Sequence, residues 1–543
     1  MSLLNPLERC QALTALDGLG LRAEGAGYSD QELHLALILL SAWGVERISH
    51  INDQPTVEWG VLLDTTRRPD SSTVDQYLGQ LLAEDERDSP TTAGERLGQI
   101  RPGGLIDQAQ RESLRCWAEA GLLAGEVWYF DGHVIEYTGA AAIGKTKHGT
   151  KQTSVKAIQR FTLANGLCSL TEYFHVSVPY AQALLILLEK AQASLPPDLQ
   201  IGKLCFDREG WDAELLVELE KQYQLVPITW VKQFANNRCL LANVPAAEFV
   251  QVNDMPIGKE DSQEVVALAD TTCTFAQLGE KRVVVLETNQ EQRLGIYTTA
   301  RHPSQTGLDD PHTMTTLALV DALRLKQRIE NQFKVDKHEM GSDCLPGQHT
   351  YPAHLALPYD LDTADQTLSR AQKRLDKYQE QMNQEQALYE EQQLDKHQLN
   401  HLAKRTHRLQ LKAQQEIDTL QQELQMVQTD EKGQTFLPTQ VTCLDVRKLT
   451  LLNLFKQHAF VALKLLAIQL GLAEANPQRL RRSFLAFGSH IHFDHKQRIA
   501  TVYAQPFPRK SVQLAYEQYC GAMSDIPISL SRNGITYRVR FSC

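Results

Sequence analysis

The chain has 543 residues, a hydrophobic content of 42%, a charged content of 22% and a net charge of -11 at pH 7. This length predicts two to four domains, and the negative charge argues against a protein that simply coats nucleic acid. No stretch reaches the roughly 18 uncharged apolar residues of a membrane span, and no secretory signal is recognisable at the N-terminus. The ten cysteines are scattered, which predicts reduced thiols in a cytoplasm and argues against a zinc ribbon.

Residues 1–125 are predicted to form a helical N-terminal domain. Ser29 can cap a helix over Gln31–Trp43. A basic, Ser/Thr-rich turn then leads into an amphipathic helix over Val74–Ala83. The inward positions of this second helix are Val74, Tyr77, Leu78 and Leu81. The pattern permits a DNA-binding helix-turn-helix, but an ordinary helical hairpin is the preferred interpretation.

Residues 126–225 are predicted to form the first part of a catalytic core. Strands are expected at Val127–Phe130, Ala157–Leu163, Ser169–His175 and Ile201–Phe206. Asn165-Gly166 predicts a tight hairpin between the second and the third of these. Helices are expected over Ala181–Ser194 and Trp211–Tyr223. This order predicts an α/β fold with a mixed sheet covered by helices, the ribonuclease-H-like arrangement.

The rest of the chain divides into four further regions. Residues 226–300 are predicted to be a β-rich insertion, and residues 301–360 the second part of the core with a helical segment over Ala322–Met340. Residues 361–435 lack Gly and Pro over most of their length and show heptad-like spacing, which predicts a coiled-coil hairpin turning near Leu394–Leu402. Residues 436–543 are predicted to be a small α+β region, with an apolar helix followed by short strands.

Three carboxylates are candidate metal ligands. Asp131 and Asp207 each directly follow a predicted strand, and Glu330 lies beside the apolar face of the Ala322–Met340 segment. Two-metal phosphoryl transfer needs carboxylates that converge on cations about 3.5 to 4 Å apart, and hard oxygen ligands suit Mg²⁺ or Mn²⁺. Taken singly, each of the two aspartates is also explained as an ordinary strand end, since an apolar strand may end in Asp, and Asp-Gly, as at Asp131, is common turn chemistry.

The strings Tyr129–His133, Phe206–Trp211 and Arg328–Lys334, taken in this order, resemble the DDE transposases of bacterial insertion sequences. The resemblance implies a ribonuclease-H-like catalytic core in which the three acids bind the catalytic Mg²⁺ or Mn²⁺ ions. It also accounts for the β-rich insertion, which one subgroup places between the second Asp and the Glu.

That subgroup also carries Tyr, Arg and Lys seven residues before, four residues before and seven residues after the Glu. The corresponding residues here are Leu323, Lys326 and Lys337. Lys337 fits the pattern, Lys326 keeps the positive charge, and Leu323 departs from it.

The resemblance implies metal-dependent DNA cleavage and strand transfer. Water would attack a phosphodiester at the transposon end, and the released 3′-hydroxyl would attack target DNA. The predicted phosphate contacts are Arg208, Lys326, Arg328, Lys334 and Lys337, for which solvent-exposed helix charge is the alternative. The expected partners are transposon-end and target DNA in the cytoplasm of a prokaryote, at its nucleoid, with no membrane. Two alternatives stay open, a nuclease that does not join strands and a catalytically inactive DNA-binding relative.

Other features suggest weaker hypotheses. Lys145–Lys151 is a basic, Gly-containing loop that could contact DNA or be merely solvated, and Lys404–Lys412 and Arg479–Arg482 are further basic surfaces. His133 points the same way as Asp131 on a continuing strand, where a structural hydrogen bond is its simplest role. Trp211 and Trp230 could stack on a base, but core packing is preferred for both, and a zinc site at His490, His492 and His495 is disfavoured. The heptad-like segment could also form a homodimer.

Overall fold

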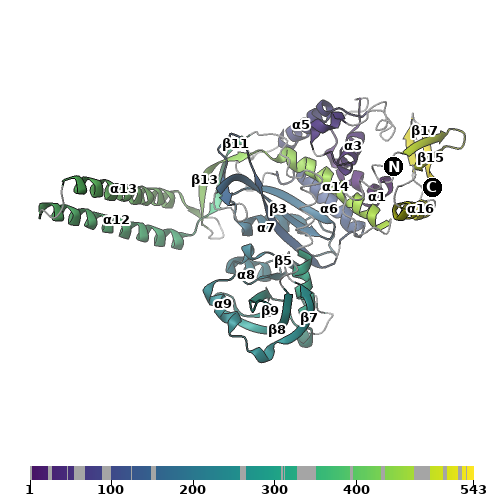
Figure 1. Ribbon diagram of the computed structural model, residues 1–543. Helices are drawn as coiled ribbons and strands as arrows, with labels where there is room; N and C mark the ends of the chain where they lie inside the picture. The colour runs from purple at the N-terminus through teal and green to yellow at the C-terminus, as the bar shows by residue number, and fades with distance from the viewer. Residues whose placement is uncertain are drawn as a thin grey trace.

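A large mixed β-sheet through the middle of the chain organises the other elements (Figure 1). The computed structural model describes residues 3–21, 27–45, 47–53, 68–87, 100–123, 125–147, 154–256, 264–306, 310, 312–326, 350–391, 396–429, 435–469, 489–504, 510–523, 529–532 and 535–542. The strands of this sheet are β1 Val127–Glu136, β2 Lys145–Lys147, β3 Ser154–Asn165, β4 Cys168–His175, β5 Lys203–Phe206, β6 Val226–Trp230, β7 Val250–Pro256, β8 Glu264–Phe275, β9 Gly279–Thr288 and β10 Arg293–Thr298.

The strand order is β2-β3-β1-β5-β6-β10-β9-β8-β7, with β4 paired to β3. Strands β1, β5 and β6 run parallel to one another, whereas β3 is antiparallel to β1 and β4 is antiparallel to β3. The predicted mixed α/β fold is therefore confirmed. Strands β7 to β10 are all antiparallel to their neighbours, and β10 pairs with β6, so the inserted segment extends the sheet.

Local sequence explains much of this sheet. The β3–β4 hairpin closes with Asn165 opposite Cys168, and Gly166 between them has a φ of 59°. Because only Gly takes this left-handed conformation without strain, Gly166 permits the two-residue loop Gly166-Leu167, which sets the register of the hairpin. Strand β1 is longer than predicted and continues to Glu136, because its second half pairs with β3 after its pairing with β5 has ended.

The helices form three groups along the chain. Helices α1 Leu4–Arg9, α2 Ala12–Leu16, α3 Asp30–Ala42, α5 Ser71–Arg87 and α6 Leu105–Glu119, with the short η1 Asp17–Leu19 and η2 Ile48–Asp53, form the N-terminal region. Helices α7 Tyr180–Gln192, α8 Ala213–Lys221, α9 Ala235–Ala242 and α10 Pro303–Thr306, with η4 Arg208–Gly210 and η5 Ala246–Glu248, lie in the sheet-containing region. Beyond them come α12 Leu361–Glu390, α13 Lys396–Met426, α14 Arg447–Gln469 and α16 Lys510–Met523.

The N-terminal helices follow their predicted patterns. Ser29 accepts a hydrogen bond from the Glu32 amide and the Glu32 side chain accepts from the Ser29 amide, a complete capping box at the start of α3. In α5 the predicted inward residues Val74, Tyr77, Leu78 and Leu81 are all fully buried. Since residues 54–67 lie outside the described part of the chain, the helix-turn-helix alternative stays a prediction.

Helix α14 lies at the centre of the helical region, although it comes late in the chain. It packs against α3, α1, α5 and β4 (Figure 1). By length and composition α14 could cross a membrane, but 78% of its apolar window is buried inside the fold. It therefore serves as a core helix here and is the apolar helix predicted for the 436–543 region.

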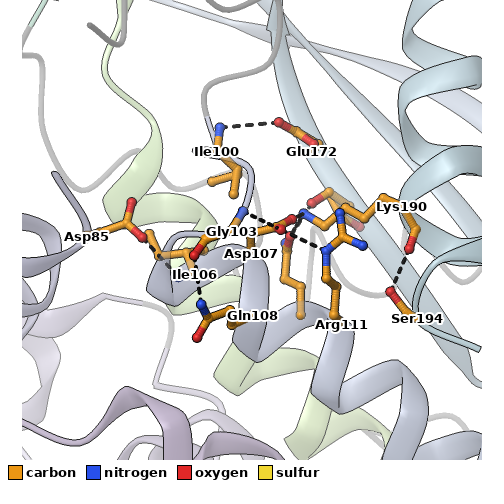
Figure 2. Close-up of polar contacts among 12 residues, drawn as sticks. Asp85, Ile100, Gly103, Ile106, Asp107, Gln108, Arg111, Glu172, Lys190 and Ser194 are labelled. Atoms are coloured by element: carbon orange, nitrogen blue, oxygen red, sulfur yellow. Dashed lines mark hydrogen bonds and ion pairs between the residues drawn. The ribbon is translucent and has the colours of Figure 1, made fainter. Parts of the chain in front are cut away.

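A buried polar cluster joins α6 to α7 and so ties the N-terminal helices to the sheet (Figure 2). The Lys190 ammonium lies 2.8 Å from the Asp107 carboxylate, and Arg111 Nε donates to the same carboxylate at 2.7 Å. The Gly103 amide donates to it at 2.9 Å. Burial alone would raise the pKa of Asp107, but Lys190 and these donors hold that pKa below its usual value.

The remaining elements form an arm and a small C-terminal sheet. Helices α12 and α13 lie side by side as a hairpin that projects from the body, and we call this pair the arm (Figure 1). Its base is a three-stranded sheet of β11 Thr350–Pro358, β13 Thr435–Leu444 and β12 Gln428–Thr429. The C-terminal sheet has the order β14 Ser489–Asp494, β15 Ile499–Ala504, β17 Ile535–Ser542, β16 Ser529–Arg532.

Candidate active site

The two predicted aspartates emerge from neighbouring parallel strands. Phe130 of β1 pairs with Phe206 of β5, and this is the last pair between the two strands. Asp131 and Asp207 are the next residue on each strand. Since paired strands lie about 4.8 Å apart, both carboxylates originate at the same edge of the sheet. Asp131 lies within β1, which continues beyond it, whereas Asp207 directly follows β5 as predicted.

Both aspartates lie on one face of the sheet. Side chains alternate along a strand, so Asp131 shares a face with Tyr129, and Asp207 shares one with Cys205. Tyr129 and Cys205 pack in the same apolar cluster as Ala322 and other residues of the helical segment 316–326. Their neighbours Phe130 and Phe206 point to the opposite face, into the cluster that contains α7 and α8.

The helical segment 316–326 places a positively charged side chain against Asp131. It crosses the sheet face where the Cys205 thiol lies 3.9 Å from the Ala322 carbonyl oxygen. At its end, Lys326 Nζ donates to Asp131 Oδ1 at 3.2 Å. The Lys326 side chain is only 5% exposed and that of Asp131 17% exposed, so the ion pair is largely shielded from water.

Lys326 was predicted from the sequence as a DNA contact. Its burial places it inside the site, against Asp131, and its contact with DNA stays a prediction. Glu330 follows Lys326 by one helical turn in the sequence, but Glu330, Arg328, Lys334 and Lys337 all lie outside the described residues.

A tight turn holds Asp207. The Asp207 carboxylate accepts a hydrogen bond from the Arg208 amide at 2.7 Å, and the Asp207 carbonyl accepts from the Gly210 amide at 3.0 Å. These contacts form the short η4 helix. Gly210 is required there, because a Cβ at this position would come within 2.6 Å of the Phe206 ring and 2.7 Å of the Tyr180 ring. Arg208 is exposed on this turn, and its contact with a phosphate stays a prediction.

Two buried residues connect the aspartates electrostatically. Burial, followed by the charges of Asp131 and Asp207, raises the pKa of Tyr180 well above its usual value. Burial also raises the pKa of the Cys205 thiol to about 12, with Lys326 opposing the shift and Asp207 and Asp131 adding to it. The charges of both aspartates therefore reach Tyr180 and Cys205, whereas Lys326 acts on Cys205. Sequence reasoning missed Tyr180, which follows Pro179 at the start of α7 and carries no distinguishing motif.

The donor set suits a hard divalent cation. Two partly exposed carboxylates at adjacent strand ends offer oxygen ligands of the kind that Mg²⁺ and Mn²⁺ prefer. Asp131 and Asp207 would hold such an ion, and a third carboxylate would complete the predicted set. Within the described ranges, which exclude Glu330, no group of three or more His, Cys, Asp or Glu side chains gathers around a potential metal position.

The nearby aromatic residues are packed rather than available for stacking on DNA. Trp211 is half-buried and meets the rings of Phe275 and Tyr297 edge-on, with centroids 5.4 and 5.3 Å away. Trp230 is half-buried and packs against the cluster beneath the 316–326 segment. The preferred interpretation of both as core residues is confirmed.

The structure also places the other candidate residues. His133 is half-buried on β1, opposite Arg160 of β3. The start of the predicted Lys145–Lys151 loop is a strand, β2, that pairs with β3. His495 contacts the Tyr537 hydroxyl at 2.6 Å through Nδ1, a structural role in the C-terminal sheet.

Comparison with known proteins gives similarity at the level of structure. Neither the protein-family models nor the curated protein sequences contain a match. Among solved structures, the chain is similar to a piggyBac transposase in a synaptic complex with hairpin DNA, with 10% sequence identity and a TM-score of 0.34. The similarity covers 62% of this chain and 68% of that one.

Proposed function

We propose that this protein is a metal-dependent DNA strand-transfer enzyme, a transposase of the DDE type. One observation carries the proposal. Asp131 and Asp207 leave adjacent parallel strands at the same point and on the same face, and a helical segment from much later in the chain reaches Asp131 through Lys326. Since Glu330 lies four residues beyond Lys326, a continuing helix would bring its carboxylate towards this edge of the sheet.

The sheet supports the same interpretation. Three antiparallel strands, β4, β3 and β1, are followed by β5 and β6 parallel to β1. This order fits the ribonuclease-H-like arrangement expected from the sequence, and β7 to β10 occupy the place of the predicted insertion. The arrangement brings the ends of β1 and β5 together, although more than 60 residues separate them in the sequence.

The roles of the residues follow from their chemistry. Asp131, Asp207 and Glu330 would hold two divalent cations, which when bound supply Lewis acidity at the attacking and leaving oxygens. Water would attack the scissile phosphodiester, and the P–O bond to the 3′ oxygen would break to leave a 3′-hydroxyl. That hydroxyl would then attack a phosphodiester of target DNA and release a new 3′-hydroxyl there. Arg208 on the η4 turn would contact a phosphate oxygen.

A strand-transfer assay with purified protein and labelled DNA ends tests the proposal. Single substitutions Asp131→Asn, Asp207→Asn and Glu330→Gln should each lower the rate at least about 100-fold. A metal ion stabilises the transition state by several kcal/mol, and each 1.36 kcal/mol corresponds to a factor of ten. Undiminished activity of Glu330→Gln would overturn the assignment.

The matched control is Glu209→Gln, which neutralises an exposed carboxylate two residues beyond Asp207 on the same turn. It should change the rate less than about threefold, since surface substitutions cost little. Cleavage that depends on the three acids but gives no joined product would indicate a nuclease. DNA binding without cleavage, unaffected by the three acids, would indicate an inactive DNA-binding relative.

A further inference from the structure

The arm projects from the body at the sheet that contains β11 and β13 (Figure 1). Its base strand β13 ends at Leu444, which packs with Val446 in one apolar cluster with Ile135 and Tyr137. Ile135 lies on β1, four residues beyond Asp131. Helix α13 has 31 residues and therefore extends about 45 Å away from this base.

The outer half of α13 has a charge opposite to that of the whole chain. Residues 396–412 contain Lys396, Lys404, Arg405, Arg408 and Lys412 and no Asp or Glu, whereas the chain as a whole has a net charge of -11. The last four of these cations are three or four residues from one another, or adjacent, and so lie on one face of the helix. All four are exposed, and we call them the cationic stripe.

The stripe is not needed to hold the arm together. The two helices are joined by Thr406 Oγ1 donating to Glu385 at 3.0 Å, by Gln410 donating to Gln379 at 2.8 Å, and near the base by Arg374 pairing with Glu416. Within the described part of the arm, no stripe residue forms an ion pair. Unpaired like charges at three- and four-residue spacing destabilise a helix, so the stripe costs stability without a role in the fold of the arm.

We propose that the cationic stripe binds the phosphate backbone of the DNA duplex on which the candidate active site acts. This proposal rests on the proposed function. The stripe begins about 21 Å from the base of α13 and spans about 12 Å, which matches three to four phosphates along one strand at about 3.4 Å of helix rise each. Compact Lys and Arg charges without partners provide sequence-independent contacts, which position a duplex rather than read its bases.

Equilibrium DNA binding without divalent metal tests the proposal independently of catalysis. The probe is a fluorescent 60-base-pair duplex, titrated between about 50 and 200 mM salt, and the variant is Lys404→Gln/Arg405→Gln/Arg408→Gln/Lys412→Gln. Each phosphate contact contributes about 0.9 to the slope of log affinity against log salt. The variant should therefore flatten this slope by about 2 to 4 and weaken binding at least tenfold at the lower salt concentration.

A matched variant on the same arm distinguishes a DNA contact made by the stripe from a general effect of total charge. Arg370→Gln/Lys373→Gln/Arg374→Gln/Lys377→Gln also removes four exposed cations, but from the middle of α12. It should leave the slope within about 1 of the wild-type slope. Gln favours helix nearly as well as Lys and Arg, and circular dichroism confirms that both variants keep their helices.

Three results would overturn the proposal. An unchanged slope in the stripe variant would mean that the stripe does not contact DNA, and equal losses in the two variants would mean that only total charge matters. A stripe variant that binds DNA normally but changes its mass in sedimentation equilibrium would show that the stripe contacts a second copy of the chain. If the wild-type protein shows no strand transfer but the stripe variant still flattens the slope of log affinity against log salt, the proposed function fails and the DNA contact stands.

Discussion

The ion pair between Lys326 and Asp131 permits a quantitative test of the site. The two groups are 3.2 Å apart, and both side chains are largely shielded from water. Removing one partner of a buried pair leaves an uncompensated charge and typically costs 3 to 5 kcal/mol. Since Asp131 keeps 17% of its side chain exposed, Lys326→Met should lower the free energy of unfolding by about 3 kcal/mol.

Chemical denaturation in EDTA measures this loss, with the double variant Lys326→Met/Asp131→Asn as the control. The double variant should recover at least about 2 kcal/mol, because it buries no unpaired charge. Magnesium provides a second measurement, since an ion at 100 times its dissociation constant stabilises a fold by about 2.7 kcal/mol. Saturating Mg²⁺ should therefore restore Lys326→Met but not the double variant. If the losses of unfolding free energy from the two single substitutions simply add up in the double variant in EDTA, the coupling between Lys326 and Asp131 is refuted. If Mg²⁺ does not stabilise Lys326→Met, metal binding at Asp131 is refuted.

Two further predictions concern stability. Burial lowers the pKa of His34 to about 4 and that of His458 to about 3. Above pH 6.5 both histidines are neutral in the folded and in the unfolded state. As the pH drops below 6.5, the unfolded state binds protons that the folded state does not, so the free energy of unfolding falls by about 2 kcal/mol for each histidine at pH 5. Urea denaturation of His34→Gln/His458→Gln at several pH values should show a flatter acid slope, and an unchanged slope would contradict this account. Gly210→Ala should cost about 1 to 3 kcal/mol by overpacking against Tyr180, and the reference substitution is Gly202→Ala, where a Cβ meets nothing within 4 Å. Equal stability of these two alanine variants, measured by thermal denaturation, would show that the turn accommodates the added methyl group without strain.

The sequence by itself determined the local elements. Apolar residues at three- and four-residue spacing predicted the inward face of α5, and Asn165-Gly166 predicted the turn between β3 and β4. These features depend on neighbours in the chain, so local periodicity and turn chemistry suffice to predict them. The sequence also supplied Asp131 and Asp207 as candidates, because each follows an apolar run.

Only the tertiary structure decided what these elements meet. It placed β1 beside β5, so that the two aspartates share an edge and a face, and it buried Lys326 against Asp131. It also packed α14 among N-terminal helices hundreds of residues earlier in the chain. No local pattern encodes such contacts, because they arise when apolar faces from distant segments are buried together. A lysine that looks like an ordinary exposed charge in the sequence can therefore become the partner of a candidate catalytic carboxylate.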